Sequence, residues 1–361
     1  MNNRLINTGV DDIVIGATIA YIVSFNSDRI TSIDVSDPSS LTFLNAYNSS
    51  TNINGAVDLA LDLNNNVAYV VSEFSDSIAS IDISDPSNLS FLNSYSSTTH
   101  LDSPIAVALD LINEVAYVVS VISETITSID ISDPLNLTFL DSYSSGTNLN
   151  DVSGIALDLR NEIAYVVCEN GDRITSIDIS NPSSLTLIDS YISSSNIQDA
   201  RDVALDLDNN IAYVASRSDG ITSIDISDPA DLSFLDSIQP LVINGAYGIE
   251  LDLANSTAYL ASRDARVGGI TSIDITDPLN LVVLDSYTEA TTLDGSEKLS
   301  LDLVKQVAYI TSRNSDKITS IDISDSSNLQ LISSYSSSTN LNGAVGIALD
   351  IPGPTSTNAY S

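Results

Sequence analysis

Apolar and polar residues alternate with a period of two along most of the chain, in short runs that polar clusters separate. Residues 57–63 (VDLALDL) place Val or Leu at every odd position and Asp or Ala between them. Three further runs follow, at residues 67–72, 78–84 and 89–95. Alternation of this kind, bounded by Asn, Asp, Pro and Ser, is typical of β-strands, and no stretch keeps a helical period. We name the four predicted strands A, B, C and D in chain order.

The four-strand unit recurs along the whole chain. Residues 154–191 (GIALDLRNEIAYVVCENGDRITSIDISNPSSLTLIDSY) are one copy. The copies align on a tyrosine in strand B, at Tyr21, Tyr69, Tyr117, Tyr165, Tyr213, Tyr259 and Tyr309, with spacings of 48, 48, 48, 48, 46 and 50 residues. A fixed period near this length indicates a propeller or a solenoid, in which each unit buries its faces only against its neighbours.

The C–D turn favours a propeller of four-stranded antiparallel blades. In the second copy this turn is residues 85–88 (DPSN), where the Asp side chain can bond nearby backbone and the proline presets φ. Six copies keep the proline, and Ser326 replaces it in the last: Pro38, Pro86, Pro134, Pro182, Pro229 and Pro278. Antiparallel blades around an axis leave only short, protected sheet edges.

The two ends of the chain predict how the ring closes. Strand A is recognisable seven times by its aspartate, but the first repeat has Val14 at that position, and a surplus copy (residues 344–351) follows the seventh blade. We therefore expect residues 344–351 to supply the inner strand for residues 19–47, which removes an open edge. The prediction is one seven-bladed domain over 16–351, with 1–15 as an edge or tail and 352–361 as a tail. The alternative is a linear fragment of a longer array.

Composition limits the chemistry that is available. Apolar residues make up 43% of the chain, enough for a core, but no apolar run approaches the length of a membrane-spanning helix, and residues 1–9 show no signal peptide. Cys168 and His100 are the only residues of their types. Disulfides, Cys-based metal sites and His-based triads are therefore not expected.

The net charge of −36 argues against nucleic acid as a partner, because phosphate binding needs Lys and Arg. It predicts a very soluble, self-repelling monomer. Abundant Asn, Ser and Thr with only three lysines suggests an extracellular, cell-surface or virion-surface protein rather than a cytoplasmic one.

The segment ITSIDISDP, with AYVV upstream, resembles LVIVD-repeat proteins and, more loosely, the YVTN class of surface-layer propellers. The resemblance covers about residues 19–351. It implies a propeller and a frequent association with surfaces, but it does not imply a function.

The repeated aspartates could bind Ca²⁺, which prefers several oxygen ligands. Seven of them lie near the end of strand A and seven lie in strand C. A role needed in every blade favours a structural interpretation instead, in which each carboxylate bonds the backbone of its own turn. We likewise expect the Asn, Asp and Gly of the D–A loops to serve turn geometry. No cofactor is therefore expected, with Ca²⁺ as the alternative.

Positions that differ between repeats are free to serve function, and the B–C loops vary most. B–C and D–A loops share one face of a four-stranded meander, and binding residues usually lie on such loops. Seven of the 12 basic residues fall in the B–C loops: Arg29, Arg173, Arg217, Arg263, Arg266, Arg313 and Lys317. Arg217, Arg263 and Arg313 occupy equivalent positions in three successive blades.

The starts of strand A in the same sector are also unusual. They carry Arg201, Glu297 and Lys298, and Glu250 replaces the Ala of other blades where strand A approaches the axis. The candidate binding residues are therefore Arg217, Arg263, Arg313, Arg201, Glu250 and Lys298. The alternative is that the arginines only offset local acidity or pair with Asp219, Asp264 and Asp316.

These features favour a non-enzymatic binding or structural module that presents one rim to a protein or glycan, with arginine contacting a carboxylate. Two alternatives stay open. One is a propeller lyase or hydrolase that uses carboxylates and arginine, and the other is a self-assembling surface or virion decoration protein.

Overall fold

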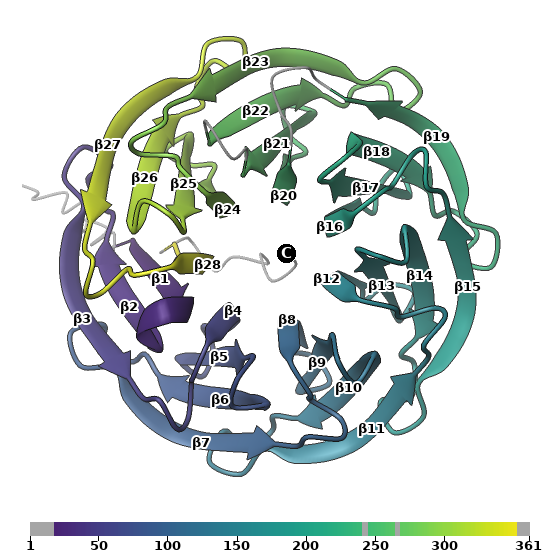
Figure 1. The fold of residues 1–361 in the computed structure, drawn as a ribbon, viewed down its shortest axis with the longest axis horizontal. Coiled ribbons are helices and arrows are strands. Elements are labelled where there is room, and N and C mark those ends of the chain that lie inside the picture. The colour runs from purple at the N-terminus through teal and green to yellow at the C-terminus, as the bar shows by residue number, and fades with distance from the viewer. Residues whose placement is uncertain (1–17, 240–244, 264–267, 352–361) are drawn as a thin grey trace, which may run out of the picture.

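The structure is a computed structural model that describes residues 18–239, 245–263 and 268–351. These residues form seven four-stranded antiparallel sheets arranged as blades around one axis (Figure 1). The predicted seven-bladed propeller is confirmed. The segments predicted as tails, 1–15 and 352–361, lie outside the described residues.

The seven innermost strands, in the place predicted for strand A, are β4 (Ala56–Asp62), β8 (Pro104–Asp110), β12 (Val152–Asp158), β16 (Ala200–Asp206), β20 (Ala246–Asp252), β24 (Ser296–Asp302) and β28 (Ala344–Asp350). The B strands are β1 (Ile19–Ser24), β5 (Val67–Ser72), β9 (Val115–Ser120), β13 (Ile163–Cys168), β17 (Ile211–Ser216), β21 (Thr257–Ser262) and β25 (Val307–Ser312). The C strands are β2 (Arg29–Asp34), β6 (Ser77–Asp82), β10 (Thr125–Asp130), β14 (Arg173–Asp178), β18 (Gly220–Asp225), β22 (Gly269–Asp274) and β26 (Lys317–Asp322). The outermost D strands are β3 (Thr42–Asn48), β7 (Ser90–Ser96), β11 (Thr138–Ser144), β15 (Thr186–Ile192), β19 (Ser233–Ile238), β23 (Val282–Thr288) and β27 (Gln330–Ser336). A single 3-10 turn, η1 (Phe25–Ser27), follows β1 in the described chain.

The predicted strand bounds agree with the structure to within one or two residues. One difference matters for the loops. The sequence analysis placed Arg29, Arg173 and Lys317 in the B–C loops, but in the structure each of them begins a C strand. The B–C loops are correspondingly short.

The core lies between the blades. Every residue of each B strand is buried, because this strand has a blade on both faces. Each hydrophobic cluster joins two neighbouring blades; one contains Tyr69 of β5 with Val118 of β9 and Ile129 of β10. Burial of apolar surface thus holds blade to blade, and no blade has a core of its own.

A serine in each C strand bonds across to the next blade. Its hydroxyl donates to the carbonyl in that blade's C–D turn, as Ser80 does to Pro134 at 2.6 Å. The same contact occurs seven times, at 2.5–2.7 Å, and Ser320 donates to Pro38 across the junction of the chain ends. In at least five blades the hydroxyl of the strand-B tyrosine makes a second such bond, as from Tyr309 to the carbonyl of Val35.

The repeated aspartates serve their own turns, as the structural interpretation predicts. Asp62 accepts the backbone N–H groups of Asn64 and Asn65 and the Asn65 side-chain amide. In strand C, Asp82 accepts the N–H of Ser84, and all seven blades repeat this bond. The D–A loops turn through left-handed residues, with φ of 57–73°, at Gly55, Ser103, Asp151, Asp199, Gly295 and Gly343.

The last strand closes the ring on the first, as the sequence predicted. β28 pairs with β1 in antiparallel register, with Ile19 opposite Asp350 and Ile22 opposite Ile347. Figure 1 shows this blade assembled from both ends of the colour scale, with β28 innermost. The described residues include no helix long and apolar enough to cross a membrane.

Closure by β28 gives a direct prediction. Deleting residues 344–361 exposes the edge of β1 and the apolar faces of two blades, so we expect a melting temperature at least 10 °C below that of a control that ends after Ile351 and keeps β28. Thermal unfolding followed by circular dichroism compares the two chains. Equal melting temperatures would show that β28 does not close the ring.

Candidate functional site

The candidate site begins where the inner strands start, on the face that carries the D–A and B–C loops. Two sets of residues meet there: the second residue of each inner strand, and the first residue after each B strand of the preceding blade. The second set is Phe25, Glu73, Val121, Glu169, Arg217, Arg263 and Arg313. Because these positions carry no blade-to-blade hydrogen bond of the repeat, their side chains are free to differ.

Charged side chains occupy this rim over the fourth to seventh blades. Arg201 on β16 pairs with Glu169, and Arg217 reaches the same Glu169 carboxylate at 3.3 Å. Arg217 also pairs with Asp199 at 3.1 Å. The carboxylate of Glu169 thus joins two arginines.

The next carboxylate along the rim repeats this arrangement. Arg263 lies 2.8 Å from the Glu297 carboxylate on β24, and Arg313 lies 3.7 Å from the same oxygen. Glu297 is 92% buried, whereas 29% of each arginine side chain is exposed. The acid is therefore covered while part of each arginine side chain stays exposed to solvent.

The ring of Tyr247 connects the two groups of ion pairs, and the ring of Phe25 lies against the last arginine. The guanidinium carbon of Arg201 lies 4.6 Å from the ring centre of Tyr247, and that of Arg263 lies 5.2 Å from the same ring. Arg313 lies 4.6 Å from the ring centre of Phe25. We name the arc formed by Arg201, Arg217, Arg263, Arg313, Glu169, Asp199, Glu297, Tyr247 and Phe25 the cationic rim.

A second group of polar side chains lies one step further along the inner strands. At the third residue of these strands the blades carry Asp58, Asp202 and Lys298, with Ala or Gly elsewhere, and at the fifth residue they carry Glu250, with Ala or Ser elsewhere. We name Asp58, Asp202, Glu250 and Lys298 the axial cluster. Small neighbours let these side chains reach toward one another: a Cβ on Gly248 would lie 3.0 Å from the Cα of Lys298.

The axial cluster contains one ion pair and makes two hydrogen bonds to neighbouring inner strands. The Lys298 ammonium lies 2.8 Å from the Asp202 carboxylate, two blades away. Asp58 and Asp202 each accept the N–H of the next inner strand, from Val107 at 3.1 Å and from Ile249 at 3.2 Å. The two aspartates therefore satisfy amide groups on the unpaired edge of β8 and β20.

Burial shifts the protonation of the acids in the axial cluster. It raises the pKa of Glu250 to about 8, with the negative charge of Asp202 adding to the effect and Lys298 opposing it. It raises the pKa of Asp58 to about 6, against the opposing charge of Lys298. Burial also disfavours the charged form of Lys298, but Asp202 and Asp58 outweigh it and raise the pKa of the ammonium. Near neutral pH Glu250 thus carries a proton while Lys298 stays charged.

The structure brings the six candidate residues into these two adjacent groups: four arginines in the cationic rim, and Glu250 and Lys298 in the axial cluster. The partners expected for the arginines were wrong in part. Arg217 and Arg313 pair with Glu169, Asp199 and Glu297. Asp219 instead accepts the N–H of Gln198, and Asp316 accepts that of Gly343. Asp264 and Arg266 lie outside the described residues.

Several members of the site were missed from the sequence. Asp58 and Asp202 could have been identified in the same way as Glu250. Each is a charged residue at a position where most other blades have Ala or Gly. Tyr247 and Glu169 could not be identified in this way. Tyr247 is the second residue of an inner strand and Glu169 is the first residue after a B strand, and both positions vary from blade to blade. Their role appears only when β16, β20 and β24 are placed side by side.

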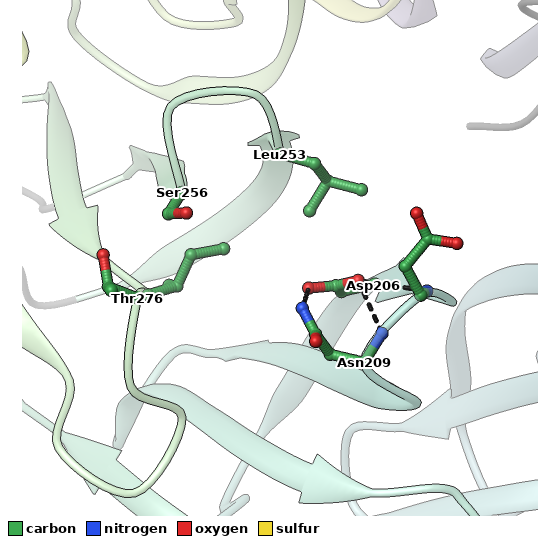
Figure 2. A pocket seen from close by; sticks show the side chains of 7 residues that line it. Asp206, Asn209, Leu253, Ser256 and Thr276 are labelled. Carbon is green, nitrogen blue, oxygen red and sulfur yellow. Dashed lines mark hydrogen bonds between the residues drawn. The ribbon is translucent and has the colours of Figure 1, made fainter.

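Other features of the described chain do not join the site. A depression of about 110 Å³ lies on the opposite face, among the A–B turns of the fifth and sixth blades, where Asp206 bonds Asn209 (Figure 2). Cys168 is buried, and His100 stacks on Phe139. Among the described residues, no three His, Cys, Asp or Glu side chains are grouped to hold a metal ion.

The fold and the repeat now define the class of protein, a seven-bladed propeller built from one recurring unit. The LVIVD repeat matches residues 10–49, 61–97, 159–193, 198–239 and 307–337, just over half of the chain. The chain belongs to the LVIVD repeat family.

Solved structures with the same fold have distant sequences. A provisionally named 6-phosphogluconolactonase from Bacteroides fragilis is 13% identical with a TM-score of 0.77, and the match covers 92% of this chain and 98% of that one. The periplasmic gluconolactonase of Pseudomonas aeruginosa is 11% identical with a TM-score of 0.76, over 94% and 100% of the two chains. A Lactobacillus plantarum protein is 18% identical with a TM-score of 0.76, over 92% and 99%. These likenesses show the fold alone. A comparison with curated proteins found no match.

The raised pKa of Glu250 predicts a pH-dependent stability. A carboxyl whose pKa is higher in the folded state stabilises the fold fully below its ordinary pKa, and this contribution is lost progressively as the pH rises from there to about 8. Glu250→Gln keeps the shape and removes the titration. We expect its melting temperature to equal that of the wild type at pH 5 and to exceed it by about 2 °C or more at pH 9.

The matched control is Glu114→Gln, which changes an exposed glutamate in an A–B turn and should follow the wild type at both pH values. A Glu250→Gln difference that is the same at pH 5 and pH 9 would contradict a proton held on Glu250.

Proposed function

We propose that this LVIVD-repeat propeller is a binding module that recognises a carboxylate-bearing glycan or an acidic protein patch through its cationic rim. The observation that carries the proposal is the convergence of Arg201, Arg217, Arg263 and Arg313 on one arc of a chain whose net charge is −36. Arginine presents a planar fork of N–H donors that matches a carboxylate.

The existing ion pairs leave the rim with donors to spare. Four guanidinium groups share three carboxylates, those of Glu169, Asp199 and Glu297. Each guanidinium has five N–H donors, and one or two carboxylate contacts leave several of them unused. The acids, of which Glu297 is buried and Glu169 and Asp199 are partly buried, hold the arginines in place. The exposed parts of Arg217 and Arg313 remain for a ligand.

The surroundings of the arginines favour a carbohydrate. Tyr247 is half-exposed between Arg201 and Arg263, and an aromatic side chain offers an apolar face together with a polar tip. Rim loops on a rigid scaffold are the usual place for such a site. A sugar acid combines the carboxylate and the apolar ring face that these side chains would contact.

The test uses D-glucuronate and its uncharged counterpart D-glucose as probes in calorimetry. The wild type is expected to bind glucuronate and not glucose. Arg263→Lys/Arg313→Lys keeps two positive charges near Glu297 but removes the forks, and we expect it to weaken glucuronate binding about tenfold or more, since hydrogen bonds to charged groups contribute about 1.5–3 kcal/mol.

Arg160→Lys is the matched control, because Arg160 pairs with Asp208 on the opposite face and should leave binding unchanged. Melting curves confirm that each variant is folded. Equal binding of glucuronate and glucose, or no effect of the double substitution, would remove the cationic rim as the site.

A second candidate function is hydrolysis, and the observation that favours it is the protonated Glu250 in the same cluster as Asp58. A neutral carboxyl can act as a general acid while a nearby carboxylate acts as a base. Three of the similar solved structures carry lactonase names, so 6-phosphogluconolactone is the substrate to test.

Hydrolysis by this route predicts proton release faster than the spontaneous rate, with a loss of about 100-fold in Glu250→Gln. A rate equal to the spontaneous one would exclude this second function and leave the binding proposal intact.

A further inference from the structure

The axial cluster lies directly beneath the cationic rim. Arg201 and Glu297 of the rim are followed on their own strands by Asp202 and Lys298 of the cluster. Lys298 is the third residue of its inner strand and Glu250 is the fifth residue of its own, so Glu250 lies about 7 Å further along the axis of the strand. A ligand anchored at the rim would therefore meet the cluster within the length of a small molecule.

Blade assembly does not account for the whole cluster. Asp58 and Asp202 each bond an amide of the next blade, but the other five blades close without an acid at that position. Glu250 and Lys298 make no such bond to a neighbouring inner strand among the described residues, and five blades have Ala in place of Glu250. Protein atoms surround both side chains closely enough to disfavour their charged forms, yet each keeps some exposure to solvent, 29% for the Lys298 side chain.

The cluster contains both hydrogen-bond donors and acceptors, with Lys298 and Asp202 in direct contact. The Lys298 ammonium donates, the carboxylates of Asp58 and Asp202 accept, and a protonated Glu250 both donates and accepts. Hydroxyl groups of a sugar likewise both donate and accept, so adjacent hydroxyls match such a set. A bare cation would have to compete with Lys298, and a second anion would meet Asp58 and Asp202.

We propose that the axial cluster is a hydroxyl-recognising subsite, so that the ligand of the cationic rim is a polyhydroxylated carboxylic acid whose carboxylate lies on the rim and whose hydroxyls lie against Asp58, Asp202, Glu250 and Lys298. This inference rests on the proposed function, because the rim anchors the ligand. It adds that the axial cluster selects sugar acids over other carboxylates.

The experiment compares D-glucuronate with cyclohexanecarboxylate, which keeps the ring and the carboxylate but has no hydroxyls. The wild type should bind glucuronate about tenfold or more tightly, since one or two hydrogen bonds to charged groups supply that preference. In Glu250→Ala/Asp58→Ala the preference should fall below about threefold, while cyclohexanecarboxylate binding stays within about threefold of the wild type.

These substitutions suit the fold, because Ala stands at the equivalent positions of other blades, as Ala106 does for Asp58 and Ala204 does for Glu250. Glu114→Gln/Glu162→Gln, which changes two exposed glutamates in A–B turns, is the matched control for the loss of two negative charges and should keep the wild-type preference. Equal binding of both probes by the wild type, or an unchanged preference in the double variant, would overturn the subsite while leaving the rim proposal standing. Binding of neither probe would instead overturn the proposed function itself.

Discussion

The structure depends on one constraint: every blade must cover both of its faces with neighbours, and the last blade must meet the first. A single blade cannot bury its B strand, whose six residues are inaccessible in all seven copies. The ring satisfies this requirement only because β28, which follows the seventh blade in sequence, pairs with β1 and completes the sheet of the first blade. Serine hydroxyls then repeat one bond around the circle, including the bond from Ser320 to Pro38 that joins the two ends.

Closure also explains why variation collects in one sector. The residues that bond blade to blade are used in every copy and cannot change without breaking a contact. The second and third residues of the inner strands, and the first residue after each B strand, carry no blade-to-blade side-chain bond that is common to all blades, although Asp58 and Asp202 each make one. Glu169, Arg217, Tyr247, Lys298 and Arg313 occupy these positions, and the ring brings them to one rim.

Electrostatics accounts for the paired arrangement of the cationic rim. The chain has 48 acidic and 12 basic residues, so an arginine side chain without a fixed partner could pair with any of several nearby carboxylates. Burying Glu297 between Arg263 and Arg313 holds the two arginine side chains in place. A covered ion pair of this kind contributes position more than stability, because desolvation offsets much of the attraction. In the axial cluster the same cost appears as a proton retained on Glu250.

The sequence by itself determined the blade, the number of blades and the closing strand, because period-2 alternation, the Asp-Pro turns and the surplus strand A are local patterns that repeat. It also determined which positions vary, and so found Arg201, Arg217, Arg263, Arg313, Glu250 and Lys298. Only the tertiary structure decided that Glu169 and Glu297, rather than Asp219 or Asp316, pair with the arginines, and that Asp58 from a distant blade joins Lys298 near the axis. The arginine ion pairs lie within one blade or between neighbouring blades, and the pair of Lys298 with Asp202 spans two blades. Such contacts depend on how the inner strands are placed around the axis, and no local sequence pattern contains that information.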